Sequence, residues 1–143
     1  MPIVFDTDVW IAYQPTSLPR SLHMSVVVLQ ELIAGAADNT SIKQYETVRR
    51  LYEKEDKLIV PSAEDWFQAG RILNALLRGW KSARGGRTPK LHPAEKQRII
   101  RDVLIARTVK RVNGLLITDN LKDFEQIKRF CNVRLISGKD YFS

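Results

Sequence analysis

Cysteine and histidine are scarce in this sequence. The chain has one cysteine, Cys131, and two histidines, His23 and His92. A single cysteine cannot form a disulfide within the chain, and neither histidine stands with it in the spacing of a zinc site. A disulfide framework and a zinc framework are therefore excluded, and the low cysteine content suits the reducing conditions of a cytosol.

Long apolar runs are absent as well. No stretch is apolar over the length that spans a bilayer, and the residues before Asp6 contain neither a basic stretch nor an apolar signal core. We therefore expect a cytoplasmic protein with no membrane partner. The 143 residues, 44% hydrophobic and 27% charged, are typical of a globular chain and predict a single domain over residues 1–143.

Acidic side chains are nearly missing from residues 78–101. This basic segment has a single acid, Glu95, and eight basic residues: Arg78, Lys81, Arg84, Arg87, Lys90, Lys96, Arg98 and Arg101. It accounts for the whole formal net charge of +7, because acids and bases balance elsewhere. Such a block indicates a polyanionic partner. The alternative is a solvated surface whose charge serves only solubility.

Short apolar segments alternate with helical patterns along the chain. The sequence predicts strands over residues 2–5, 23–25, 58–60, 115–118 and 133–137. It predicts helices over residues 7–13, 26–37, 41–56, 62–80, 94–112 and 120–130. The clear loop is the stretch 81–93. Because the strands are too far apart for hairpins, we expect an α/β fold with a parallel sheet flanked by helices on both faces.

Four acids stand where a carboxylate is costly to bury. Asp6 directly follows the first strand and Asp119 follows the strand over 115–118, so both reach the same edge of a parallel sheet. Glu31 and Asp102 lie in the apolar helical stretches LQELIAG and RDVLIA. A buried acid without a partner destabilises the fold, so each of these needs a cation or hydrogen-bond donors.

Each acid also has an ordinary structural explanation. The first two could cap the helices that follow them, while Glu31 and Asp102 could pair with Arg101 or Arg107. However, the four acids come from four separated segments, and no matching set of basic residues lies in apolar stretches. Carboxylates gathered together repel one another unless a cation neutralises them. Oxygen ligands alone favour a hard ion, Mg²⁺ or Mn²⁺.

Four segments, in their order and spacing, resemble the acidic signatures of the PIN-domain family, particularly the VapC-type toxins of bacterial toxin–antitoxin pairs. They are VFDTDVWI, SVVVLQELIAG, RDVLIARTVKRVNGLLITDN and LKDFEQI, and the similarity extends over nearly the full length. In that family the metal is held by the Asp of a D-T motif, the Glu of an E-L-x-x-G motif and the Asp of a D-x-L-I-A motif. Those residues fall on Asp6, Glu31 and Asp102.

The resemblance implies a PIN-like three-layer fold and a Mg²⁺- or Mn²⁺-dependent endoribonuclease. It also implies a homodimer that is silenced by a cognate antitoxin bound over the active-site groove. The basic segment would then hold the RNA substrate, and the candidate RNA-binding side chains are Lys81, Arg84, Arg87 and Lys90. Trp80 could stack on an unpaired base, although a tryptophan at the end of an apolar helical stretch is more often part of the core.

The sequence departs from the family pattern at two places. Where the family usually has a small residue after I-A of the third motif, this chain has Arg107, which affects how that helix packs. The fourth acid is ambiguous. Placement at a strand end favours Asp119 as the closer acid with Asp123 in a water-mediated role, whereas the resemblance favours Asp123. We interpret Asp8 as a cap or a supporting residue. The predicted catalytic and metal-binding set is Asp6, Glu31, Asp102, Asp119 and Asp123.

Other functions fit the same sequence. The chain could be a catalytically silent module that binds RNA or a partner protein, with acids that only cap helices, or a housekeeping RNA-processing nuclease. Metal-dependent cleavage of single-stranded RNA separates the silent module from the enzymes. A phosphoacceptor signalling domain fits least, because Pro61 rather than an acid follows the strand over 58–60.

Overall fold

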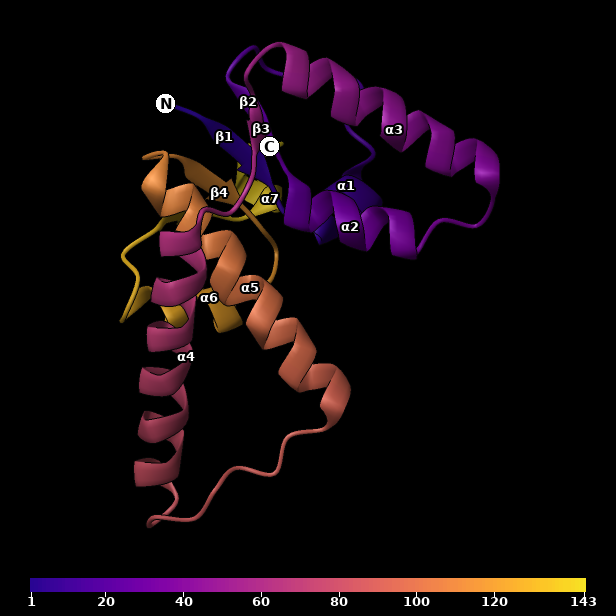
Figure 1. Ribbon diagram of the computed structural model, residues 1–143. Helices are drawn as coiled ribbons and strands as arrows, with labels where there is room; N and C mark the ends of the chain where they lie inside the picture. The colour runs from indigo at the N-terminus through magenta and orange to yellow at the C-terminus, as the bar shows by residue number, and fades with distance from the viewer.

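Five short parallel strands form the centre of the protein, whose computed structural model describes residues 1–143 (Figure 1). Their order across the sheet is β3-β2-β1-β4-β5, and every neighbouring pair is parallel. The strands are β1 (Ile3–Phe5), β2 (Leu22–Ser25), β3 (Leu58–Ile59), β4 (Leu115–Ile117) and β5 (Arg134–Ile136). The strand order reverses between β1 and β4, and ligands of open parallel sheets bind at the carboxyl edge of such a point.

Seven helices complete the fold. They are α1 (Thr7–Tyr13), α2 (Val26–Ala34), α3 (Asn39–Lys54), α4 (Ala63–Ala83), α5 (Pro93–Arg111), α6 (Leu121–Lys128) and α7 (Gly138–Tyr141). Figure 1 shows α4 and α5 as two long helices that diverge toward the loop joining them, while α3 extends away from the sheet on the other side. None of the helices is both long and apolar enough to cross a membrane.

Side chains alternate across the strands and fill a core on each face of the sheet. Val4 of β1 and Leu116 of β4 pack on one face with apolar residues of α4, α5 and α6. Phe5 and Ile117, their neighbours along the same strands, pack on the opposite face with residues of α1, α3 and α7. Helices thus cover both faces, and the predicted three-layer α/β architecture is confirmed.

The predicted boundaries differ from the observed ones mainly around the basic segment. Helix α4 continues to Ala83, so Lys81 is helical and the loop shrinks to residues 84–92. Gly85 and Gly86 turn the chain there with φ of 66° and 85°, the left-handed region that glycine adopts without strain. The short helix α7 was not predicted. It begins at Ser137, whose hydroxyl accepts a hydrogen bond from Asp140 N.

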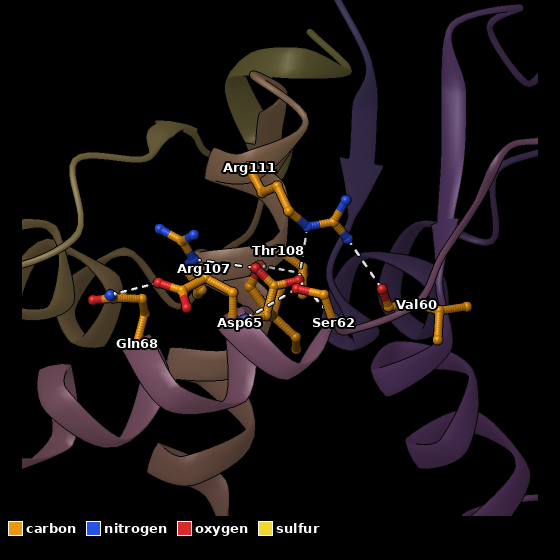
Figure 2. A network of polar contacts seen from close by, with 9 residues as sticks. Val60, Ser62, Asp65, Gln68, Arg107, Thr108 and Arg111 are labelled. Carbon is orange, nitrogen blue, oxygen red and sulfur yellow. Dashed lines mark hydrogen bonds and ion pairs between the residues drawn. The ribbon is translucent and has the colours of Figure 1, made fainter.

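Arg107, the departure from the family pattern, packs by pairing with Asp65 of α4. The Asp65 carboxylate accepts hydrogen bonds from Arg107 Nε at 3.1 Å and from Arg111 Nε at 2.7 Å, as Figure 2 shows. Arg111 also donates to the carbonyl oxygen of Val60 at 3.0 Å. The two arginines therefore tie α5 to the start of α4 and to the end of β3.

Asp65 also completes the predicted start of α4. Ser62 Oγ accepts from Asp65 N at 3.1 Å, and the Asp65 carboxylate accepts from Ser62 N at 3.0 Å, which makes a reciprocal capping box. Burial alone would raise the pKa of the fully buried Asp65. The hydrogen bonds from Ser62 and Arg111, with the charge of Arg111, outweigh it and lower the pKa. Asp65 therefore stabilises the fold by holding α4 against α5, the helix that carries Asp102.

Candidate active site

Asp6 lies at the carboxyl end of the central strand β1 and is the N-cap of α1. Its Oδ1 accepts a hydrogen bond from Thr7 N and its Oδ2 accepts one from Thr118 Oγ1, both at 2.8 Å. Asp6 therefore does cap α1, and the hydroxyl of Thr118, directly after β4, orients its second carboxylate oxygen. The residue is only 6% exposed. Burial raises its pKa, Glu31 adds to the rise, and the hydrogen bonds from Thr118 and Thr7 oppose it.

Asp102 lies on α5 and is likewise 6% exposed. Burial, followed by the negative charges of Asp6, Glu31 and Asp123, raises the pKa of Asp102 to about 8, while Arg98 acts in the opposite direction. Asp6, Glu31 and Asp123 therefore lie close enough to Asp102 to repel its carboxylate through an interior of low dielectric. We call Asp6, Glu31, Asp102 and Asp123 the acidic cluster.

Glu31, on α2, joins the acidic cluster but also has a cationic neighbour. Arg101 Nε lies 3.6 Å from Glu31 Oε2, an ion pair slightly longer than a hydrogen bond. This Nε has no hydrogen-bond partner although it is buried. The pairing considered as the ordinary explanation for Glu31 is thus present, whereas the alternative for Asp102 is not, because Arg107 pairs with Asp65.

The contacts of Asp119 and Asp123 favour Asp123 as the fourth acid. Asn120 Nδ2 lies 3.2 Å from Asp123 Oδ2 and 3.4 Å from Asp102 Oδ2, so one amide bridges the two acids. Arg98 Nε is 4.0 Å from Asp123. The expectation that Asp119 is the closer acid does not match this arrangement, because its side chain makes its contacts elsewhere.

Asp119 binds the start of α7 and the end of α1. Its Oδ1 accepts a hydrogen bond from Gly138 N at 2.8 Å, and its Oδ2 accepts one from the Tyr13 hydroxyl at 2.6 Å. The bond to Asp119 raises the pKa of Tyr13 to about 12. Asp119 does not cap α6, which follows it, because that helix has no side-chain cap. Its observed role is to anchor the last helix of the chain.

Asp8 lies in the first turn of α1, next to the acidic cluster. Its Oδ2 accepts from Asp119 N at 3.2 Å, and its Oδ1 is buried without a partner, as is Thr7 Oγ1. Burial, with the charges of Asp6 and Asp119, raises the pKa of Asp8 to about 6. Its position fits the supporting role expected from the sequence.

The oxygen-rich set fits a hard divalent cation in its chemistry. The Asp102 carboxylate and the three acids that repel it, with unpartnered buried oxygens on Thr7 and Asp8 beside them, are suited to Mg²⁺ or Mn²⁺. In the arrangement described, no group of three or more His, Cys, Asp or Glu side chains is spaced to hold one ion. Glu31 and Asp123 instead have arginine neighbours, so closing around an ion would require these two side chains to move.

Only the last part of the basic segment contacts the acidic cluster. Lys81, Arg84, Arg87 and Lys90, the candidate RNA-binding residues, are all exposed at the end of α4 and on the loop that follows. Arg98 and Arg101, further along the segment, contact the acids themselves. In the sequence both arginines belong to the basic segment. The four-residue spacing of Arg98 and Asp102 is the signal that these two side chains share one face of a helix.

An open pocket of about 740 Å³ lies between α4, α5 and α6. Asp102 and Asp123 form part of its lining, as do Trp80 and Arg84. Trp80 packs partly against the core, and its Nε1 donates a hydrogen bond to Gln126 Oε1 at 3.0 Å. Trp80 is therefore partly a core residue and partly a surface of the pocket on which a base could stack.

Solved structures from three bacteria have the same fold. A chain in the structure of VapBC-1 from nontypeable Haemophilus influenzae is 22% identical with a TM-score of 0.63, covering 97% of this chain and 99% of that one. A chain in the structure of DNA-bound VapBC from Salmonella typhimurium is 18% identical with a TM-score of 0.57, covering 96% of this chain and 98% of that one. A chain in the structure of VapBC2 from Rickettsia felis, bound to a promoter DNA fragment, is 23% identical with a TM-score of 0.55. The match covers 96% of this chain and 98% of that one.

At these identities the likeness concerns the fold. No family model matches the sequence, and no curated protein matches it. Together with the five-stranded parallel sheet, the solved structures confirm the predicted PIN-like fold.

Proposed function

We propose that this protein is a metal-dependent endoribonuclease and the toxin of a toxin–antitoxin pair. The observation that carries the proposal is the acidic cluster: Asp6 and Asp102 are buried without a basic side chain within ion-pair distance, and the charges of Asp6, Glu31 and Asp123 repel Asp102. Such repulsion destabilises the fold, and carboxylates with strongly shifted pKa values are characteristic of functional sites.

The cluster suits hydrolysis of a phosphodiester. Asp6, Asp102, Glu31 and Asp123 would hold Mg²⁺ or Mn²⁺, which when bound lowers the pKa of a coordinated water and neutralises developing negative charge. Thr118 and the backbone of Thr7 orient Asp6, and Asn120 holds Asp102 and Asp123 together. No histidine is needed for this chemistry.

The RNA backbone would lie along the exposed basic residues. Phosphate contacts from Lys81, Arg84 and Arg87 position a strand without reading its sequence. Replacing these three residues with Gln should weaken binding to all RNA sequences. It should also flatten the dependence of log affinity on log salt by about 0.7 for each lost contact on single-stranded RNA. An unchanged slope in titrations at several salt concentrations would leave the segment with a solubility role.

A cognate antitoxin and a homodimer are further parts of the proposal. Support for the antitoxin comes from the similar structures, which are of VapBC from three bacteria. Co-expression with the protein encoded next to this gene tests it: a stable complex that suppresses cleavage is the expected result. Light scattering of the purified chain, with an expected mass of two copies, tests the homodimer.

The decisive measurement is cleavage of single-stranded RNA by the purified chain. Cleavage should require Mg²⁺ or Mn²⁺, stop with excess chelator and return when metal is added back. One observation favours the silent binding module instead: Arg101 and Arg98 lie against Glu31 and Asp123 and partly neutralise them. RNA binding without metal-dependent cleavage would select that alternative. Cleavage without any antitoxin partner would select a housekeeping nuclease.

A further inference from the structure

The pocket between α4, α5 and α6 lies directly against the acidic cluster. Asp102 and Asp123 belong to both, so a ligand in the pocket is adjacent to any phosphate held at the cluster. The volume of about 740 Å³ is ample for a nucleotide. Trp80, a candidate for stacking on a base, and Arg84, a candidate phosphate contact, both line the pocket, but the proposed function assigns no ligand to the pocket itself.

One side of the pocket is apolar and aromatic. Its lining includes Trp80, Leu91, Ile99 and Phe130. The hydrogen bond from Trp80 to Gln126 fixes the plane of the indole ring. A ligand that stacks on the ring therefore does not have to pay the entropic cost of immobilising it. Phe130 remains 46% exposed although it is large and apolar. These surfaces offer a flat ligand a place to stack.

The remaining lining is mostly charged. Arg84, Arg98, Lys122 and Arg129 are cationic, and the acids are Glu95 and the two members of the acidic cluster. With those two assigned to the cation, the cationic side chains are in excess. The pocket therefore combines an aromatic surface with groups that attract phosphate, which matches a nucleotide better than it matches an apolar side chain of a protein.

We propose that this pocket holds one unpaired nucleotide of the RNA substrate, next to the phosphate that is cut, with its base against Trp80. The proposal rests on the proposed function in that RNA is the ligand. Stacking on an aromatic side chain accepts every base, so the pocket selects an unpaired nucleotide before it selects a sequence. RNA held in a duplex would be excluded because its bases are not free to enter.

Two glycines of α4 give a matched pair of variants. Gly79 lines this pocket, whereas Gly70 lines a separate hollow beside Trp66 and Phe67. Nothing lies within 4 Å of a Cβ added at either position. Leucine is a much better helix former than glycine, so Gly79→Leu and Gly70→Leu should both fold at least as stably as the parent. Only Gly79→Leu places a side chain in the pocket.

Binding is measured with a labelled single-stranded RNA in chelator, where the proposed nuclease does not cut. Gly79→Leu should weaken binding by about 5- to 150-fold, the range expected for losing one stacked base. Gly70→Leu should bind as the parent does. Parental binding by Gly79→Leu would overturn the proposal and leave the pocket to a protein ligand. Thermal unfolding of both variants confirms that each is folded.

A second measurement identifies the base. RNAs that carry one abasic nucleotide at successive positions should bind the parent weakly at one position, and the variants Gly79→Leu and Trp80→Ala should lose that dependence. If no position matters, or if the variants keep the parent's pattern, no base enters the pocket. A parent that shows the pattern but never cleaves with Mg²⁺ or Mn²⁺ would refute the nuclease and keep this inference. A parent that binds no RNA would refute both.

Discussion

Asp65 and Asp102 are both buried acids on the long helices α4 and α5, but their environments are opposite. Asp65 accepts hydrogen bonds from two arginines, and its pKa is lowered. Asp102 faces three other acids, and its pKa is raised to about 8. Burial of a carboxylate therefore does not by itself identify a functional site. The sign of the surrounding charge distinguishes an acid that stabilises the fold from one that is available to bind a cation.

The largest expected effect is on cleavage. Asp6→Asn and Asp102→Asn should each reduce metal-dependent RNA cleavage by more than about 100-fold, because even residues that only support metal ligands are worth about 10- to 100-fold. The matched control is Asp38→Asn. Asp38 caps α3 by accepting from Ser41 N at 2.8 Å, much as Asp6 caps α1. Since Asn caps a helix as well as Asp does, a parental rate in Asp6→Asn would reduce Asp6 to a cap.

The second effect is on stability and belongs to the other acid. Asp65→Asn should lower the free energy of unfolding by about 2–4 kcal/mol, since it leaves two arginines without their carboxylate, although both stay partly solvated. Urea denaturation measures this loss. Glu64→Gln, in the same helical turn, is the control and should stay within about 0.5 kcal/mol of the parent. A tolerated Asp65→Asn would mean that the arginine pairs contribute little.

The pH dependence of stability should separate the two acids further. The raised pKa of Asp102 means that its contribution favours the folded state at low pH and is lost as the pH rises from its usual pKa through about 8. Asp65 behaves oppositely: its stabilisation is present above its usual pKa and is lost as the pH falls through the lowered value.

In chelator, Asp102→Asn should therefore gain stability over the parent as the pH increases. A gain of about 4 kcal/mol between about pH 5 and 8 is expected, because each pH unit between the usual and the raised pKa changes the difference by about 1.4 kcal/mol. Urea denaturation at several pH values measures the difference. A difference that is independent of pH would mean that Asp102 does not titrate in this range and that the cluster does not repel it.

The smallest effect concerns the fourth acid. Asp123→Asn should raise the Mn²⁺ concentration needed for half-maximal cleavage by about tenfold. Asp119→Asn should change it little and instead weaken the attachment of α7, because Asp119 accepts from Gly138 N. Manganese titrations of both variants decide the matter. The reverse result would restore Asp119 as the closer acid, as its place at a strand end suggests.

Much of the fold followed from local patterns in the sequence. The strands β1, β4 and β5, and the start of α4 at Ser62, follow from apolar runs and residue spacing, which act over a few neighbouring positions. The same patterns placed Asp6 at the sheet edge and Asp102 in an apolar helix. The helix α7 was missed because four residues show no periodicity.

What each acid faces was decided only by the tertiary structure. Asp65 and Asp102 are both acids in predicted helices, and nothing in the sequence near either one shows which charges surround it. Arg107 and Arg111 reach Asp65 across 42 and 46 residues of chain, while Asp119 turns toward Gly138 instead of Asp102. Electrostatic energy depends on distances between side chains from separate segments, and those distances are set by how the helices pack on the sheet.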